Sequence, residues 1–180
     1  MILTLVDRRT AADGTSPEFH GENWARLQRL AAGVGCADWP VDVVLVDVES
    51  MTDLNERFRD KQGVTDILSF SYLENEGEGA AALVRGEGFA AADLWLAAEM
   101  IGPEAGDAVG ELVLAPGFIG ERCAQNDWPQ GAEIPMLVVH GCLHLVGWDH
   151  QEADQLQAMQ DHEVSILTGE GLAHPLRQRS

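Results

Sequence analysis

Half of the chain's six histidines lie close together in the sequence, at His140, His144 and His150. His140 and His144 are four residues apart, so on a helix their rings project from one face, one turn apart. Gly147 is well placed to end that helix in the left-handed conformation, and the chain can then fold back and bring His150 towards the other two rings. Three neutral imidazoles with an open fourth position are typical of a catalytic zinc site. We therefore predict one Zn²⁺ per chain, bound by His140, His144 and His150.

The same spacing resembles the H-E-x-x-H-x-x-G-x-x-H pattern of metzincin proteases, with one change. Position 141, where such a protease carries its general-base glutamate, is Gly141. A chain without that carboxylate lacks the group that activates the attacking water, which disfavours peptidase chemistry. A metalloprotease-like hydrolase stays open as an alternative. Gly141 costs the helix about 1 kcal/mol relative to alanine, and we interpret its bare backbone as room for substrate beside the metal.

Residues 140–150 read H-G-C-L-H-L-V-G-W-D-H. This run resembles the H-G-x-L-H-L-x-G-[aromatic]-D-H signature of the YbeY family, the bacterial metal-dependent endoribonucleases of ribosomal RNA maturation. A second segment, residues 54–70, is similar to the family's L-N-x-x-[aromatic]-R-x-K-x-x-x-T-D-V-L-S-F run. Residues 110–115 are a weaker match to a strand of the same family.

The resemblance implies a zinc-dependent, single-strand-specific endoribonuclease that acts in small-subunit rRNA maturation and in ribosome quality control. RNA and the ribosomal small subunit are then the expected partners, and Arg59 and His140 the expected catalytic residues. From the residues alone, Arg59 is either a guanidinium that grips a phosphate after a helix end or an ordinary surface arginine. No general base can be named, so either water or the ribose 2′-hydroxyl could attack. The first alternative is a zinc-containing ribosome assembly or binding factor without catalysis, and the metalloprotease-like hydrolase is the second.

Composition predicts a cytoplasmic globular protein. A chain of 180 residues with 46% hydrophobic content can form one domain, residues 1–180, with a substantial core. No apolar span reaches the length of about 18 residues needed to cross a membrane, and Asp7, Arg8 and Arg9 come too early for a signal peptide. The three cysteines form no C-x-x-C pair, so we expect no disulfide framework. On a helix Cys142 points away from both neighbouring histidines, which favours a place in the core.

The net charge of −19 repels a polyanion such as RNA at long range. Three of the eleven cationic side chains nevertheless fall within five residues: Arg57, Arg59 and Lys61. This local concentration bears more directly on RNA binding than the net charge does. The sequence contains no nucleotide-binding glycine loop and no nucleophile elbow.

The elements alternate between strands and helices, which predicts an α/β fold. We expect strands at residues 1–8, 41–48, 65–70 and 110–115, and helices at residues 22–32, 51–58, 116–126 and 152–167 beside the histidine helix. They should form a small mixed sheet of about four strands packed with helices. Ser50 is the expected cap of the second helix. Residues 74–109 resemble a flexible surface insertion, in which residues 89–100 are a helix or a hairpin arm.

A histidine that binds a metal through one ring nitrogen usually donates a hydrogen bond from its other ring N–H to an acceptor. Asp149, adjacent to a ligand, and Asp66 are the candidates for that role. In the last helix, Leu156, Met159, Glu163 and Ile166 lie near one face and should pack on the core. We expect His162 to face solvent rather than a metal, and the tail from His174 onwards to be frayed.

Overall fold

The computed structural model describes residues 1–10, 16–36, 38–72, 108–148, 150 and 152–175. At its centre is a four-stranded sheet in the order β1-β2-β4-β3. The strands are β1 (Ile2–Asp7), β2 (Pro40–Leu45), β3 (Ile67–Ser71) and β4 (Gly110–Leu114). β1, β2 and β4 run parallel, whereas β3 runs antiparallel to β4. The predicted mixed α/β sheet is confirmed.

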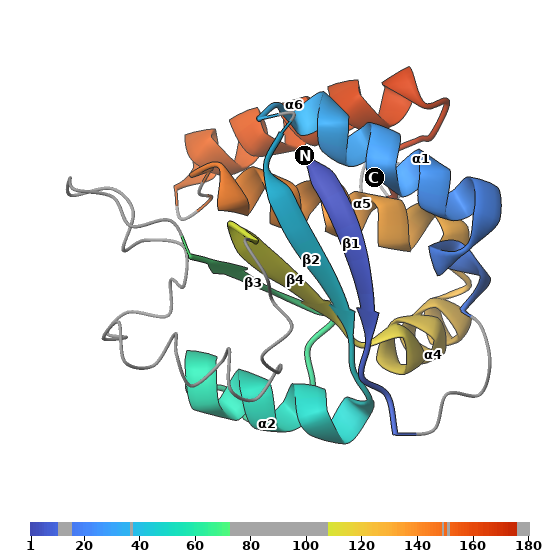
Figure 1. Ribbon diagram of the computed structural model, residues 1–180, viewed down its shortest axis with the longest axis vertical. Coiled ribbons are helices and arrows are strands. Elements are labelled where there is room, and N and C mark those ends of the chain that lie inside the picture. Colours follow the sequence, from blue (N-terminus) through green and yellow to red (C-terminus); the bar gives the residue numbers. More distant parts are fainter. Residues whose placement is uncertain (11–15, 37, 73–107, 149, 151, 176–180) are drawn as a thin grey trace.

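Helices cover both faces of this sheet, as Figure 1 shows. One face packs against α1 (Gly21–Val34) and α5 (Gln130–Leu145). α6 (Ala153–Gly169) lies on these two helices, away from the sheet, and α4 (Pro116–Asn126) packs beside α5. The other face packs against α2 (Val48–Arg59). A short 3₁₀ helix, η1 (Pro17–Phe19), precedes α1. This cover explains why β4 is buried along its whole length and reads as a nearly continuous apolar run.

Successive side chains of each strand point to opposite faces of the sheet, which divides the core into two layers. On the α5 side lie Val43, Leu112 and Leu114, together with Val138 and Leu143 from α5 itself. The side chains that point to the α2 side are Val44, Phe70 and Val113, and they pack against Leu54 and Phe58 of α2. The strands therefore position α5 on one face of the sheet and α2 on the other.

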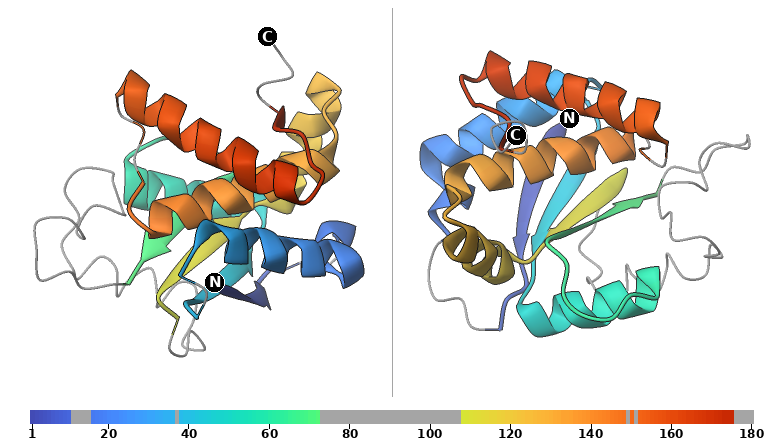
Figure 2. Two further views of the ribbon diagram at one scale, coloured as in Figure 1. Left: turned by 90° about the horizontal axis from the view of Figure 1, so that it is seen from above. Right: turned by 180° about the vertical axis from the view of Figure 1, so that it is seen from behind.

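α5 is the central helix of the thicker layer. It contacts α1, α4, α6, β3 and β4, and Figure 2 shows it between α6 and the sheet. Its burial follows from its sequence, because the run from Ile134 to Val139 offers no polar side chain that would need water. Any group that this helix carries is thus fixed by packing on several sides.

The start of α2 differs from the expectation. The helix begins at Val48, three residues earlier than predicted, and its N-cap is Asp47 rather than Ser50. The Asp47 side chain accepts a hydrogen bond from the Ser50 backbone N–H at 2.9 Å. Aspartate is as good an N-cap as serine. Asp47 comes before Ser50 in the chain, so α2 begins after Asp47.

Most of the expected insertion, with residues 89–100, lies outside the described residues, as does Asp149. Val109 belongs to the sheet's hydrogen bonding instead, since its N–H donates to Pro40 at 2.8 Å and its carbonyl accepts from Tyr72 at 2.9 Å. Within the described part of the chain, no helix has the length and apolar character to cross a membrane.

Candidate metal centre

The last turns of α5 and the segment after it bring three histidines together. His140 and His144 lie on α5, and His150 follows the turn at its end. One ring nitrogen from each histidine lies within 4.8 Å of the other two. The ring centroids are 4.6 Å apart for His140 and His144, 5.3 Å for His140 and His150, and 5.0 Å for His144 and His150. The predicted convergence is confirmed.

The turn that returns the chain depends on Gly147. Its N–H donates to the His144 carbonyl at 3.0 Å, and the Trp148 N–H donates to the Leu143 carbonyl at 3.1 Å. Gly147 has φ of 96°, a conformation that other residues rarely adopt. These bonds satisfy carbonyls at the helix end and reverse the chain, as the sequence predicts.

The rings of His140 and His144 are both fixed through Nδ1. His140 Nδ1 lies 2.8 Å from Glu163 Oε1, and His144 Nδ1 lies 2.9 Å from the carbonyl oxygen of Trp148. A carboxylate and a carbonyl only accept hydrogen bonds, so each Nδ1 is the donor and each Nε2 keeps its lone pair.

The two Nε2 atoms face each other. His140 Nε2 and His144 Nε2 are 3.1 Å apart. Two nitrogens at about 2.0–2.1 Å from a tetrahedral zinc ion are about 3.3–3.4 Å apart, so small adjustments of the two rings suffice. The tautomers and the spacing of these residues therefore both fit a divalent metal ion such as zinc.

Glu163 is the acceptor that sequence reasoning missed. Its side chain is 3% exposed, and its second oxygen, Oε2, lies 2.8 Å from His174 Nε2. Burial alone would raise the pKa of Glu163, but the hydrogen bonds from His140 and His174 outweigh it, and the pKa lies below its usual value. The signal was present in the sequence, because an acid on the apolar face of an amphipathic helix needs a buried partner.

Four other expectations are wrong. Asp66 does not orient a histidine ring; its carboxylate accepts from Arg122 at 2.5 Å. His174 is not frayed but buried, with 4% of its surface exposed. Leu156 is exposed rather than packed on the core, and His162 is half-buried, with its ring stacked on that of Trp148.

Gly141 faces the sheet rather than a substrate. A Cβ at this position would lie 2.7 Å from Leu112 Cδ2 and 3.0 Å from Ser69 Oγ, closer than side-chain carbons pack. The interpretation of Gly141 as room for substrate is therefore wrong: its bare backbone lets α5 approach β3 and β4. For the same reason a protease-like glutamate at position 141 could not be accommodated without moving the helix.

Cys142 lies in the core, as expected, with none of its surface exposed. Burial raises the pKa of its thiol to about 12. The thiol is therefore neutral near pH 7, and a neutral thiol is neither a good nucleophile nor a good metal ligand.

Arg59 lies in the last turn of α2 and is exposed. It belongs to the opposite face of the sheet from the histidine helix. In Figures 1 and 2, however, the C-terminal ends of α2 and α5 lie towards the same side of the molecule, with edge strand β3 between them. Arg59 shares this end of α2 with Arg57 and Lys61, so the local cluster of positive charge is retained.

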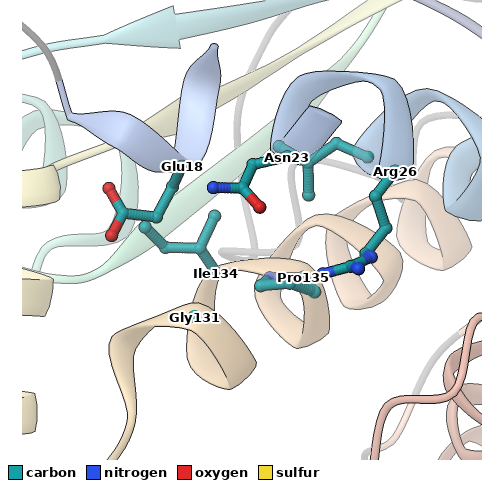
Figure 3. A pocket seen from close by; sticks show the side chains of 7 residues that line it. Glu18, Asn23, Arg26, Gly131, Ile134 and Pro135 are labelled. Carbon is teal, nitrogen blue, oxygen red and sulfur yellow. The ribbon is translucent and has the colours of Figure 1, made fainter. Parts of the chain in front are cut away.

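A small hollow lies at the other end of α5. Figure 3 shows it between α1, η1 and the first turns of α5, lined by Glu18, Asn23, Arg26, Leu27, Gly131, Ile134 and Pro135. Its volume of about 60 Å³ accommodates water rather than a nucleotide. None of the residues predicted to do chemistry contributes to it.

Comparison with known proteins points to one family. A family model described as Endoribonuclease YbeY matches residues 22–170. The chain is 30% identical over 176 residues to the Endoribonuclease YbeY of Methylococcus capsulatus, covering 98% of this chain and 95% of that protein. It is 35% identical over 151 residues to that of Symbiobacterium thermophilum, covering 82% and 81%. With the protein from Magnetococcus marinus the identity is 33% over 148 residues, covering 81% and 88%.

The fold also has a solved counterpart. A solution structure of a Thermotoga maritima protein superposes with a TM-score of 0.51 and 17% sequence identity, covering 93% of this chain and 91% of that one. At this identity the similarity concerns the arrangement of helices and strands alone.

Proposed function

The chain belongs to the YbeY endoribonuclease family, and from that premise we propose that it is a metal-dependent hydrolase that cleaves phosphodiester bonds of RNA. The metal ligands are His140, His144 and His150. The observation that carries the proposal is the convergence of their ring nitrogens within 4.8 Å. Three imidazoles favour zinc over harder ions such as Mg²⁺, which prefer oxygen ligands. One zinc ion per chain is the cofactor that we propose.

Three protein ligands leave a fourth position for water or substrate, as in catalytic rather than structural zinc sites. When bound, zinc supplies Lewis acidity towards a phosphoryl oxygen and lowers the pKa of a bound water towards about 7. The protein's own contribution is to hold the rings. Glu163 and the Trp148 carbonyl keep the Nδ1 protons of His140 and His144 in place, so both Nε2 atoms stay available.

Arg59 is the second catalytic residue of the proposal, beside His140. Its planar guanidinium can grip two phosphate oxygens at once and offset the charge that builds up during cleavage. Its place at the end of α2, on the side of the molecule where α5 also ends, supports this role. Arg57 and Lys61 add positive charge beside it, which a chain with a net charge of −19 needs locally to bind RNA.

We further propose that the substrate is single-stranded ribosomal RNA, processed during maturation of the small subunit and in ribosome quality control. The family's name supplies RNA, and the three histidine side chains are only partly buried, which leaves them accessible to an unpaired strand. A cytoplasmic location and a single domain over residues 1–180 complete the proposal.

The test compares single-stranded RNA digestion by the purified protein with and without a chelator. We expect one zinc ion per chain by metal analysis, cleavage that a chelator abolishes, and loss of both zinc and cleavage in His144→Ala. A zinc-loaded, folded protein that binds RNA without cutting it would instead support a non-catalytic assembly factor. Chelator-sensitive turnover of casein would support a peptidase, which the fit of Gly141 against the sheet disfavours.

A further inference from the structure

Glu163 lies between two histidine rings that come from different parts of the chain. Oε1 is 2.8 Å from His140 Nδ1, and Oε2 is 2.8 Å from His174 Nε2. The side chains of Glu163 and His174 are 3% and 1% exposed. Because water has almost no access to these contacts, their loss cannot be made good by solvent.

Two packing features bring the three side chains together. α6 packs along α5, which places Glu163 beside His140. After α6 the chain reverses, with the Leu172 N–H donating to the Leu167 carbonyl at 2.9 Å and Gly171 at φ of 70°. This turn carries His174 back to the buried side of α6, where it meets the second oxygen of Glu163.

We infer that Glu163 is a positioning residue of the metal site, orienting the His140 ring, and that His174 holds the Glu163 carboxylate in turn. This inference rests on the proposed function, in which His140 is a metal ligand. A carboxylate can only accept hydrogen bonds, so His140 Nδ1 donates to it and Nε2 points to the other ligands. With its second oxygen bound by His174, the carboxylate cannot turn away from His140.

The inference extends the metal site beyond its ligands. Glu163 accepts a hydrogen bond from His140 and another from His174. His174, a residue after the last helix, therefore influences the orientation of the ring that we propose binds the ion. A structural role alone, such as packing α6 on α5, would affect stability without changing the ring tautomer or the zinc affinity.

The experiment measures zinc affinity by competition with a chelating dye, and the His140 tautomer in the metal-free protein by ¹⁵N NMR. The variants are Glu163→Gln, Glu163→Ala and His174→Ala. Glu133→Gln is the matched control, because Glu133 is a glutamate of α5 that is 2% exposed and bound by Arg122. Circular dichroism checks that each variant is folded.

We expect Glu163→Ala to bind zinc about 10- to 100-fold more weakly than the parent, and Glu163→Gln, which retains one acceptor, about 10-fold more weakly. His174→Ala should lose less, about 3- to 10-fold, because only the carboxylate's second partner is gone. The metal-free parent should show His140 protonated at Nδ1, and Glu163→Ala a mixture of tautomers. The control should keep the parent's affinity and tautomer.

Folded Glu163→Ala with unchanged affinity and tautomer would overturn the inference. If that variant does not fold, Glu163→Gln decides in the same way. Unchanged affinity in His174→Ala would overturn the role of His174. The proposed function fails separately: a zinc-loaded parent that leaves RNA intact contradicts the nuclease, while the order of zinc affinities can still be measured.

Discussion

The ring of His162 stacks on that of Trp148, with centroids 5.1 Å apart and 12° between the planes. The carbonyl of Trp148 accepts the hydrogen bond from His144 Nδ1. The next residue of α6, Glu163, accepts the one from His140. Two adjacent residues of α6 therefore support both proposed ligands of α5. Glu163 contacts His140 directly, and His162 supports His144 by stacking on Trp148.

Trp148→Ala should weaken zinc binding about 10-fold, because the turn that holds His144 and carries His150 loses its stacking partner. Trp148→Phe should retain most of the affinity, since a planar ring remains to stack on His162. Zinc titration of both purified variants measures the difference. Equal affinity in all three proteins would mean that the turn is held by its backbone hydrogen bonds alone.

Arg59→Ala should lower kcat/KM for single-stranded RNA by about 100-fold, if its guanidinium offsets charge at the phosphate undergoing cleavage. Zinc content should not change. Arg57→Ala is the control, because it removes the same charge two residues away on the same exposed helix end. Similar losses in the two variants would show that the cluster acts only through its summed charge.

Gly141→Ala should destabilise the fold by about 1–3 kcal/mol, because the new methyl group must displace Leu112 or move α5 away from the sheet. Gly131→Ala in the same helix is the control. A Cβ there meets no atom within 4 Å, and alanine favours helix, so this change should be neutral or stabilising. Urea unfolding of the two variants gives the comparison, and a stable Gly141→Ala would contradict the close approach.

Arg122→Met should cost about 3–5 kcal/mol of stability, since it leaves a buried carboxylate without its cation. The guanidinium of Arg122 lies 2.9 Å from Glu133 Oε1, and Glu133 is 2% exposed. Arg29→Met removes an arginine that likewise binds two acids, Glu22 and Glu170, at the surface. That change should alter the melting temperature little, because exposed pairs contribute weakly. Equal effects would contradict the importance of burial.

Glu111 should contribute less to stability as pH rises from about 4.5 to 7. Burial raises the pKa of Glu111 to about 7, with a contribution from the charge of Asp42, against the opposing effects of the Tyr72 hydroxyl and Arg8. In this window the folded chain holds a proton on Glu111 that the unfolded chain has released. The resulting stabilisation is complete below the unfolded pKa and is lost as pH rises through the folded pKa.

Glu111→Gln cannot ionise and removes this dependence. The stability of the variant minus that of the parent should therefore increase with pH and level off above about pH 7. Urea unfolding of both metal-free proteins from pH 5 to 8 provides the difference, in which the titration of the histidines cancels. A difference independent of pH would contradict the shifted pKa.

The convergence of the three histidines was predictable, because helical spacing brings two of them together locally. His140 and His144 must share a face, and Gly147 marks where the helix ends. The order of strands and helices was predictable because local hydrophobic periodicity indicates each element. The start of α2 was not, because Asp47 and Ser50 are both good caps and only the structure decides between them.

Contacts between distant elements could not be derived in this way. Glu163 is 23 residues from His140 in sequence, and their meeting depends on how α6 packs on α5. Which neighbour Gly141 faces depends on the rotation of α5 against the sheet. His174 follows the last helix, where composition gives no sign of a buried role. In each case the sequence supplies the residue type and tertiary packing supplies its partner.

The antiparallel pairing of β3 and β4 has one more consequence. Ser71 pairs with Gly110, and Tyr72 donates to Val109, so the chain on either side of residues 73–107 is already joined by the ladder. A β-hairpin needs only a few residues to connect such strands. A short loop in place of those thirty-five residues could therefore connect β3 to β4 and give a shorter version of the protein. A reporter sequence could be inserted at the same place.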